Sequence, residues 1–314
     1  MGYSLNSTMI PFILFIPCKT TGALMLETTY KHHFEYSDLS SIKECLNEHG
    51  FALVKQVLSN QILDALKTAT LREAQKLKLN ESWQSKTCLN FIEKAPEALL
   101  LLDHNPHMNI IKYLHNTDEL CFHRSACIAR EKGSSVVSWH TDLSQLKTGE
   151  SPTSANEVLN NSTLDYNGFS AWYYLTGSRP SHGGLYVIEN SHKPDWQLPE
   201  GFEFTNYKKS FRRIGDTEEG YQKFDIPGAI PIITDPGDLI LFTKNTYHAA
   251  NANQENEIRL SCGAIGFRPK RIKINAPWDW PKSTHDFKAR LDQKYHHYLD
   301  GYTSIVPDWK PGIS

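Results

Sequence analysis

The sequence predicts a mainly β fold, a sandwich or barrel, preceded in the chain by helices. From Glu119 onward, short apolar runs alternate with clusters of Gly, Pro, Asn and Ser, which is the pattern of strands separated by turns. Between residues 37 and 79, apolar side chains instead recur at helical spacing. The chain has 314 residues. Because a sandwich or barrel often uses about 200–250 residues as one unit, we expect a single core.

Capping residues place the helices of the first part. Ser37 or Asp38 can cap a helix that ends near Gly50, since a glycine often follows the last turn of a helix. Ser59 can cap a second helix, because its hydroxyl can accept a hydrogen bond from the first turn. A third helical stretch is expected over residues 96–113.

The expected strands are short apolar runs bounded by turn residues. They cover residues 51–54, 120–130, 169–175, 184–189, 230–233, 238–242 and 258–267. Two polar stretches interrupt them, residues 143–168 and about 194–222. A connection as long as the first is usually functional or disordered, so it is either a lid that orders over a substrate or an exposed, tolerant insertion.

Composition argues against several classes of protein. The formal net charge is −2 and there is no basic block, so we expect no nucleic-acid partner. The apolar run over residues 9–17 is too short to span a bilayer as a helix, so we expect no membrane partner either. Six cysteines without a C-x-x-C pair indicate reduced, mostly buried thiols in a cytoplasmic protein.

One domain is expected over residues 25–314. Within it we expect a helical part over about 37–115, a β core over about 119–270 and a C-terminal extension over 271–314. Residues 1–24 are expected to be a poorly ordered extension, with Met25 as an alternative start. We expect the protein to be a monomer or a homodimer.

The segment Trp139-His140-Thr141-Asp142 carries the first candidate site. In a strand, alternate side chains point to the same face, so His140 and Asp142 would lie side by side. One imidazole and one carboxylate are two of the three ligands of the facial triad that suits Fe(II) and leaves positions on the metal open. Alone the pattern is weak, because a solvated His–Asp pair gives the same sequence.

A second group of polar residues follows a buried strand. His248 lies shortly after the apolar run that ends at Phe242, and residues 251–256 have the composition of a turn. A hairpin centred in that turn would put His248 directly opposite Arg259, with Ser261 on the same face as Arg259. A bulge in the hairpin would shift this register.

An arginine inside a β core needs an anionic partner, because an unpaired buried charge is costly. Arg259 can bind one carboxylate of a dicarboxylate ligand through two parallel hydrogen bonds, and Ser261 can donate a third. The other end of the same ligand, a 2-oxo acid, can chelate the iron. The alternative is that Arg259 pairs with a structural Asp or Glu.

At these residues the chain resembles the phytanoyl-CoA dioxygenase-like family of Fe(II)/2-oxoglutarate oxygenases. The resemblance covers roughly residues 39–268. Its motifs are H-G-F-A-L-V at 49–54, W-H-x-D at 139–142, G-G-L-Y-V-I-E-N-S-H at 183–192, P-G-D at 236–238, and R-L-S at 259–261 after His248. Each motif is modest by itself, and the ordered set is specific.

The resemblance implies a double-stranded β-helix core, the jelly roll of cupin-like proteins, with flanking helices. It implies that His140, Asp142 and His248 are the iron ligands. It also implies that Arg259 and Ser261 bind the distal carboxylate of 2-oxoglutarate.

The resemblance gives weaker assignments to other residues. Arg130 stands roughly where relatives carry a basic residue, and Trp172 where they line the cosubstrate pocket, so both are expected to contact cosubstrate or substrate. His182 and His192 are the rival third ligands, but neither is followed by an arginine at comparable spacing within a strand. Nucleic-acid demethylases of the AlkB type carry a second arginine closer to the first; the next arginine here is Arg268.

The expected function is the hydroxylation, or a related oxidation, of a small-molecule metabolite, with a biosynthetic pathway as the expected setting. O2 and 2-oxoglutarate are the expected cosubstrates, and succinate and CO2 the products. Asp142 supports hydroxylation, because related halogenases carry a small residue there. Two alternatives stay open: a protein or peptide side-chain hydroxylase of the same fold, and a non-redox, cupin-like metal-binding protein.

Four basic residues lie close together in the second polar stretch: Lys208, Lys209, Arg212 and Arg213. They would either face an acidic or CoA-bearing substrate or belong to a solvated loop.

Overall fold

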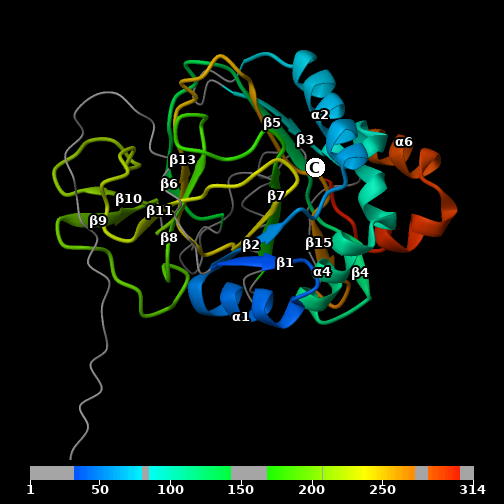
Figure 1. Cartoon of the computed structure of the whole chain (residues 1–314), viewed down its shortest axis with the longest axis horizontal. Coiled ribbons are helices and arrows are strands. Elements are labelled where there is room, and N and C mark those ends of the chain that lie inside the picture. Colours follow the sequence, from blue (N-terminus) through cyan, green and yellow to red (C-terminus); the bar gives the residue numbers. More distant parts are fainter. Residues whose placement is uncertain (1–31, 80–84, 143–167, 207, 273–281, 305–314) are drawn as a thin grey trace, which may run out of the picture. The chain divides into compact units, whose positions relative to one another are not determined.

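The computed structural model describes residues 32–79, 85–142, 168–206, 208–272 and 282–304. These residues form two main β sheets (Figure 1). The large sheet has the order β1 (His33–Glu35), β2 (Phe51–Lys55), β12 (Leu239–Thr243), β7 (Phe169–Tyr174), β14 (Arg259–Gly263), β5 (Ala126–Arg130) and β3 (Lys86–Leu89). The small sheet has the order β11 (Ala229–Pro231), β8 (Leu185–Ile188), β13 (His248–Ala250), β6 (Val137–His140), β10 (Ser210–Arg213) and β9 (Phe202–Thr205). A separate pair consists of β15 (Phe267–Pro269) and β4 (Leu120–Phe122).

The order of the strands along the chain identifies the fold. The core strands alternate between the sheets, because β6, β8 and β13 belong to the small sheet while β7, β12 and β14 belong to the large one. The pairs that they form are antiparallel, and β1 with β2 forms a parallel pair. This winding is that of a jelly roll. The predicted double-stranded β-helix core with flanking helices is therefore confirmed.

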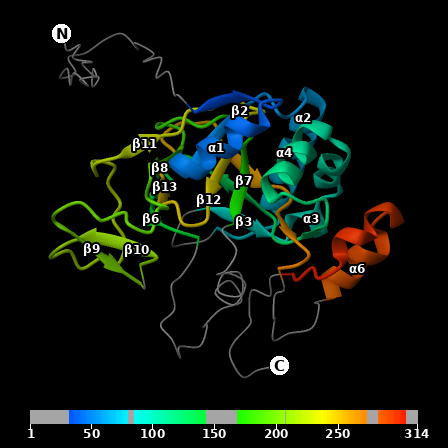
Figure 2. The ribbon, with the colours of Figure 1, turned by 90° about the horizontal axis from the view of Figure 1, so that it is seen from below.

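Helices cover the outer face of the large sheet (Figure 2). They are α1 (Leu39–His49), α2 (Asn60–Gln75), α3 (Phe91–Lys94), η1 (Pro96–Asp103) and α4 (Asn105–His115). Near the C-terminus, α6 (Lys282–Arg290) lies beside α3, and η2 (Gln293–Leu299) lies beside β4. Their apolar residues share one buried cluster with strand residues such as Tyr173, Leu241 and Cys262. Neighbouring positions along these strands point the other way, toward the inside of the roll.

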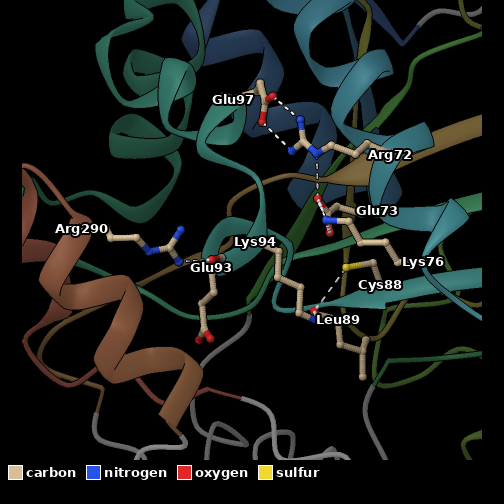
Figure 3. Close-up of polar contacts among 9 residues, drawn as sticks. All are labelled: Arg72, Glu73, Lys76, Cys88, Leu89, Glu93, Lys94, Glu97 and Arg290. Atoms are coloured by element: carbon tan, nitrogen blue, oxygen red, sulfur yellow. Dashed lines mark hydrogen bonds and ion pairs between the residues drawn. The ribbon is translucent and has the colours of Figure 1, made fainter.

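Ion pairs and carbonyl contacts join the helices to one another (Figure 3). Arg72 of α2 donates through Nη2 to Glu97 Oε2 of η1 at 2.9 Å and through Nε to Glu73 Oε1, also at 2.9 Å. Glu73 is buried, and Lys76 supplies a second cation to it at 2.8 Å. From α6, Arg290 donates to the backbone oxygen of Glu93 at 2.8 Å. These contacts hold the helical layer in place behind the large sheet.

Several local signals predicted the structure correctly. Asp38 precedes α1, which ends at Gly50 in the left-handed region with φ 86°. Ser59 caps α2, because its side chain accepts a hydrogen bond from the Ile62 amide. The five cysteines in the described part of the chain are free and buried. No helix in that part is both long and apolar enough to cross a membrane.

Other expected elements are divided or were missed. The run at 120–130 forms β4 and β5, which belong to different sheets, and the run at 258–267 likewise forms β14 and β15. The helical stretch at 96–113 is broken between η1 and α4. The polar stretch at about 194–222 contains β9 and β10. The expected extension at 1–24 and residues 143–167 of the expected lid lie outside the described residues, and the domain bounds stay a prediction.

The expected hairpin between His248 and Arg259 is wrong. His248 begins β13 of the small sheet, whereas Arg259 begins β14 of the large sheet. The two residues are therefore not cross-strand neighbours. The segment between them carries the chain from one sheet to the other and forms an isolated bridge between Asn253 and His182.

Asn253 holds this crossing in place. Its buried amide donates to the backbone oxygens of Arg130 and Glu257, both at 2.9 Å, and its side-chain oxygen accepts from the Glu255 amide at 3.0 Å. The side chain thus replaces the ladder hydrogen bonds that a hairpin would supply. It also ties the crossing to the end of β5.

We predict that Asn253→Ala lowers the free energy of unfolding by about 2 kcal/mol, because it leaves buried backbone groups without partners. The measurement is urea unfolding followed by circular dichroism. Asn256→Ala is the matched control: exposed Asn256 accepts from Lys132 at the surface, and we expect a change of at most about 0.5 kcal/mol. Equal effects of the two substitutions would contradict the role given to Asn253.

Candidate metal centre

Two neighbouring strands of the small sheet bring three possible metal ligands together. His140 ends β6 and His248 begins β13, and the two residues are directly opposite each other in the antiparallel register. Their ring centroids lie 4.3 Å apart. Asp142 follows β6, with its Oδ1 3.9 Å from His248 Nε2. Donor atoms of the three residues all lie within 4.8 Å of one another.

Backbone carbonyls orient both imidazoles. His140 Nδ1 lies 2.8 Å from the Ser138 oxygen, and His248 Nδ1 lies 3.0 Å from the Thr246 oxygen. A carbonyl can only accept, so each Nδ1 carries the proton and each Nε2 keeps its lone pair. Such contacts to the second ring nitrogen are typical of histidines that bind metals. The backbone two residues before each histidine thus sets its tautomer.

The pKa shifts of His140 and Asp142 also favour binding of a cation. Burial, and then the neighbouring His248, lowers the pKa of His140 to about 4, so this imidazole is neutral at neutral pH. Shielding from water acts to raise the pKa of Asp142, but His248 and Arg124 outweigh it and the pKa lies below its usual value. Ser170 donates to Asp142 Oδ2 at 2.9 Å and leaves Oδ1 turned toward His248. Two imidazoles and one carboxylate form a donor set that suits a divalent ion such as Fe(II).

Strand β7 extends from this centre to the arginines of the large sheet. Ser170, Trp172 and Tyr174 alternate along it and share one face. Ser170 contacts Asp142, and the ring of Tyr174 lies under the Arg259 guanidinium at 4.8 Å. Trp172 lies between them, against Gly263 of β14, where an added Cβ would come within 2.5 Å of the indole ring. Trp172 therefore lies in the interval between the two groups, and its contact with cosubstrate or substrate stays a prediction.

Arg259 and Arg130 form the second half of the site. They are directly opposite each other on β14 and β5, and both are almost fully buried. Arg259 donates to Ser261 Oγ at 2.7 Å, while its Nε and Arg130 Nη1 are buried without a hydrogen-bond partner among the described residues. Burial, and then the charge of Arg259, lowers the pKa of Arg130 to about 10.

These two guanidinium groups lack an anion. In the described part of the chain no carboxylate forms an ion pair with either of them, so the alternative of a structural Asp or Glu partner finds no support there. Two adjacent buried cations with unpaired donors create a strong preference for a bound anion. A carboxylate group satisfies it through parallel hydrogen bonds.

The rival histidines are engaged elsewhere. His182 Nε2 lies 3.0 Å from the Glu257 oxygen, and His192 Nε2 lies 2.9 Å from the Asn47 oxygen. Neither belongs to the group formed by His140, Asp142 and His248. Among the described residues the geometry therefore favours His248 as the third ligand.

Two of the four basic residues near β10 have surface partners. Arg212 pairs with Glu203 at 2.8 Å, and Arg213 pairs with Asp225 at 2.9 Å. The backbone oxygen of Lys209 accepts a hydrogen bond from the Thr141 amide at 2.8 Å, next to the metal ligands. The ion pairs of Arg212 and Arg213 thus favour a solvated loop over contact with an acidic substrate.

Sequence reasoning missed Ser170 and Tyr174. Both lie two residues from Trp172 within one predicted strand, so alternation alone would have put them on its face. It also missed Lys244, whose buried ammonium lies 3.4 Å from His123 Nε2. Burial lowers the pKa of Lys244 to about 8. A lysine after an apolar strand carries no signal that distinguishes it from a surface residue.

Comparisons with known proteins bear on the family and the fold of the chain. The sequence profile of the family described as phytanoyl-CoA dioxygenase (PhyH) matches residues 46–261. No curated protein sequence matches.

Solved structures of similar fold include three of distant sequence. The epimerase SnoN in complex with Fe3+, alpha ketoglutarate and nogalamycin RO is 14% identical, with 88% of this chain and 97% of that chain covered and a TM-score of 0.53. The carbocyclase SnoK from nogalamycin biosynthesis is 19% identical, with 76% and 93% covered and a TM-score of 0.51. EctD from S. alaskensis with 2-oxoglutarate and 5-hydroxyectoine is 15% identical, with 84% and 87% covered and a TM-score of 0.50.

We predict that Ser170→Ala weakens Fe(II) binding at this centre by about tenfold, because the Asp142 carboxylate loses the hydrogen bond that fixes its rotation. Anaerobic calorimetric titration with Fe(II) measures the change. Ser181→Ala is the control, since Ser181 donates to Glu255 away from the site. An unchanged affinity in Ser170→Ala would contradict this role.

Proposed function

We propose that this chain, a member of the phytanoyl-CoA dioxygenase family and an Fe(II)- and 2-oxoglutarate-dependent oxygenase, hydroxylates a small-molecule metabolite. The iron would be held by His140, Asp142 and His248. The observation that carries the proposal is that a group of metal ligands and a pair of buried arginines lie on facing sheets of one core. Three metal donors converge at the end of the small sheet, and two buried arginines with unpaired donors lie on the large one. A molecule with an oxo acid at one end and a carboxylate at the other fits both.

The residues present fit the metal. Each histidine would coordinate through Nε2, because Nδ1 is engaged by a backbone oxygen, and Asp142 would coordinate through Oδ1. A facial arrangement of this kind leaves three positions for cosubstrate and O2. When bound, iron and 2-oxoglutarate together supply O2-dependent oxidation of a substrate C–H bond, with release of succinate and CO2.

The arginine pair fits the distal carboxylate of 2-oxoglutarate. Arg259 would donate through its unpaired Nε and a second nitrogen of the same fork, which gives the parallel geometry that carboxylates prefer. Ser261 accepts from Arg259 and holds the fork in orientation. Arg130 Nη1 is a further donor on the neighbouring strand. Trp172 excludes water between the carboxylate and the metal ligands.

Asp142 supports hydroxylation as the outcome. A carboxylate at this position occupies one metal position, whereas a small residue would leave that position to a halide. The carboxylate is held ready by Ser170 and by nearby cationic groups. The non-redox, cupin-like alternative does not explain a buried arginine pair with unpaired donors.

The substrate class is proposed on weaker support. Structures of similar fold were solved with small organic molecules, nogalamycin RO in SnoN and 5-hydroxyectoine in EctD. We therefore favour a free metabolite over a protein or peptide side chain, without a nucleic-acid or membrane partner. A cytoplasmic location accords with the free, buried cysteines of the described residues, and a monomer or homodimer stays the expected state.

Anaerobic addition of Fe(II) and 2-oxoglutarate tests the site directly. We expect a visible charge-transfer band that requires both components, because only an oxo acid bound to iron produces it. His140→Ala should lose the band and release no succinate in a screen of metabolites, whereas His192→Ala should keep the band. Absence of the band in the unaltered protein, or turnover by His140→Ala, would refute the ligand assignment.

We predict that Arg259→Ala raises the concentration of 2-oxoglutarate needed for half-maximal formation of this band by about 10–100-fold, with the band itself retained. The reason is the loss of charge-assisted hydrogen bonds worth about 1.5–3 kcal/mol. Arg212→Ala is the control, because that guanidinium pairs with Glu203 at the sheet edge. An unchanged requirement in Arg259→Ala would count against the carboxylate site.

A further inference from the structure

A second group of metal-binding side chains lies where three distant segments meet. His32 precedes β1, His49 is the last residue of α1, and Glu189 follows β8. Donor atoms of the three residues lie within 4.8 Å of one another. Figure 2 shows α1 beside β8, and the Asn190 amide donates to the His49 oxygen at 3.1 Å. We propose that His32, His49 and Glu189 bind a zinc-type divalent ion that fastens the N-terminal strand and helix to the small sheet.

The distances are close to those of a zinc site. Glu189 Oε1 lies 3.3 Å from His32 Nε2 and 2.8 Å from His49 Nδ1. Tetrahedral zinc with bonds of about 2.0–2.1 Å separates its ligand atoms by about 3.3–3.5 Å. The first distance fits directly, and the second fits after a shift of about half an ångström in an exposed carboxylate. Despite its closeness, His49 Nδ1 makes no hydrogen bond to that carboxylate, so the nitrogen is aimed beside the oxygen.

The other ring nitrogen of His32 has the kind of partner that metal-bound histidines use, because His32 Nδ1 lies 3.4 Å from Cys45 Sγ. His49 Nε2 lies 3.6 Å from Glu48 Oε2, which is beyond hydrogen-bond distance. The Cys45 thiol donates its single proton to the Phe51 oxygen at 3.2 Å, so His32 Nδ1 is the donor to sulfur. The Nε2 lone pair of His32 then faces a carboxylate oxygen. Two such groups at 3.3 Å repel each other unless a proton or a metal ion lies between them, and a metal ion would satisfy both.

Charge distinguishes this group from a similar one. His182, Glu255 and Glu257 also cluster, but Arg179 forms ion pairs with both glutamates and its hydrogen bond lowers the pKa of Glu255 to about 2. That group already contains its cation. Within the described residues, no lysine or arginine forms an ion pair with Glu189. The carboxylate is also 30% exposed, so an ion can enter from solvent.

The position of the site explains what the ion would do. Ser191, two residues after Glu189, accepts from the Tyr247 amide at 2.9 Å, and Ile188 donates to the Tyr247 oxygen at 2.9 Å. An ion at Glu189 would therefore stiffen the turn that holds the segment before His248. The three protein ligands leave a fourth position to water, and the bound state adds its binding free energy to folding.

The experiment uses the full chain with His140→Ala and Asp142→Ala, which removes the catalytic centre as a competing site. Zinc chloride is added, excess is removed by gel filtration, and zinc per chain is counted by mass spectrometry. We expect about one ion per chain and a higher Tm. Adding Glu189→Gln or His49→Asn should reduce retained zinc at least tenfold. Adding Glu255→Gln is the matched control and should leave it unchanged.

A direct spectrum guards against variants that fail to fold. Co(II) added to the double variant should give the visible bands of a four-coordinate ion, and one added equivalent of zinc should abolish them. Failure to retain zinc together with an absent cobalt spectrum would overturn the proposal. Retention of zinc unchanged in both Glu189→Gln and His49→Asn would overturn it equally.

Discussion

The antiparallel pairing of β6 with β13 is the constraint on which the rest of the site depends. It sets His140 and His248 opposite each other, and alternation along the chain then adds Asp142 to the same side. Two imidazoles with their lone pairs turned to one point and a carboxylate held in its charged form have little reason to approach so closely without a cation. The pairing is a backbone property, so the donors are preorganised before any metal arrives.

The large sheet carries buried positive charge, whereas the metal ligands on the small sheet favour a bound cation. Arg259 and Arg130 are two buried cations with unpaired donors, an arrangement that costs stability until an anion binds. Strand β7 relates the two halves, since Ser170 at one end contacts Asp142 and Tyr174 at the other lies under Arg259. One strand therefore sets the spacing between the two groups. A cation site on one sheet and an anion site on the other select a molecule that joins them.

How much the sequence could predict depended on the range of the interactions. Signals within a few residues succeeded: Ser59 capped a helix, Gly50 ended one, and alternation put His140 beside Asp142. The hairpin expected between His248 and Arg259 failed, because nothing in the turn-rich segment between them shows that the chain changes sheets. Strands β9 and β10 were missed because they lie at an edge and are only partly buried, so their composition is polar.

The helical part does more than cover the large sheet. Gly50, at the end of α1, accepts through its backbone oxygen from both the Thr243 amide at 2.9 Å and the Thr246 hydroxyl at 2.8 Å. Thr246 in turn supplies the backbone oxygen that orients His248. A side chain at Gly50 would meet His192 Nδ1 at 2.5 Å, and its φ of 86° disfavours any other residue. The close approach of α1 to this turn therefore requires glycine, and through Thr246 it fixes the tautomer of a metal ligand from outside the roll.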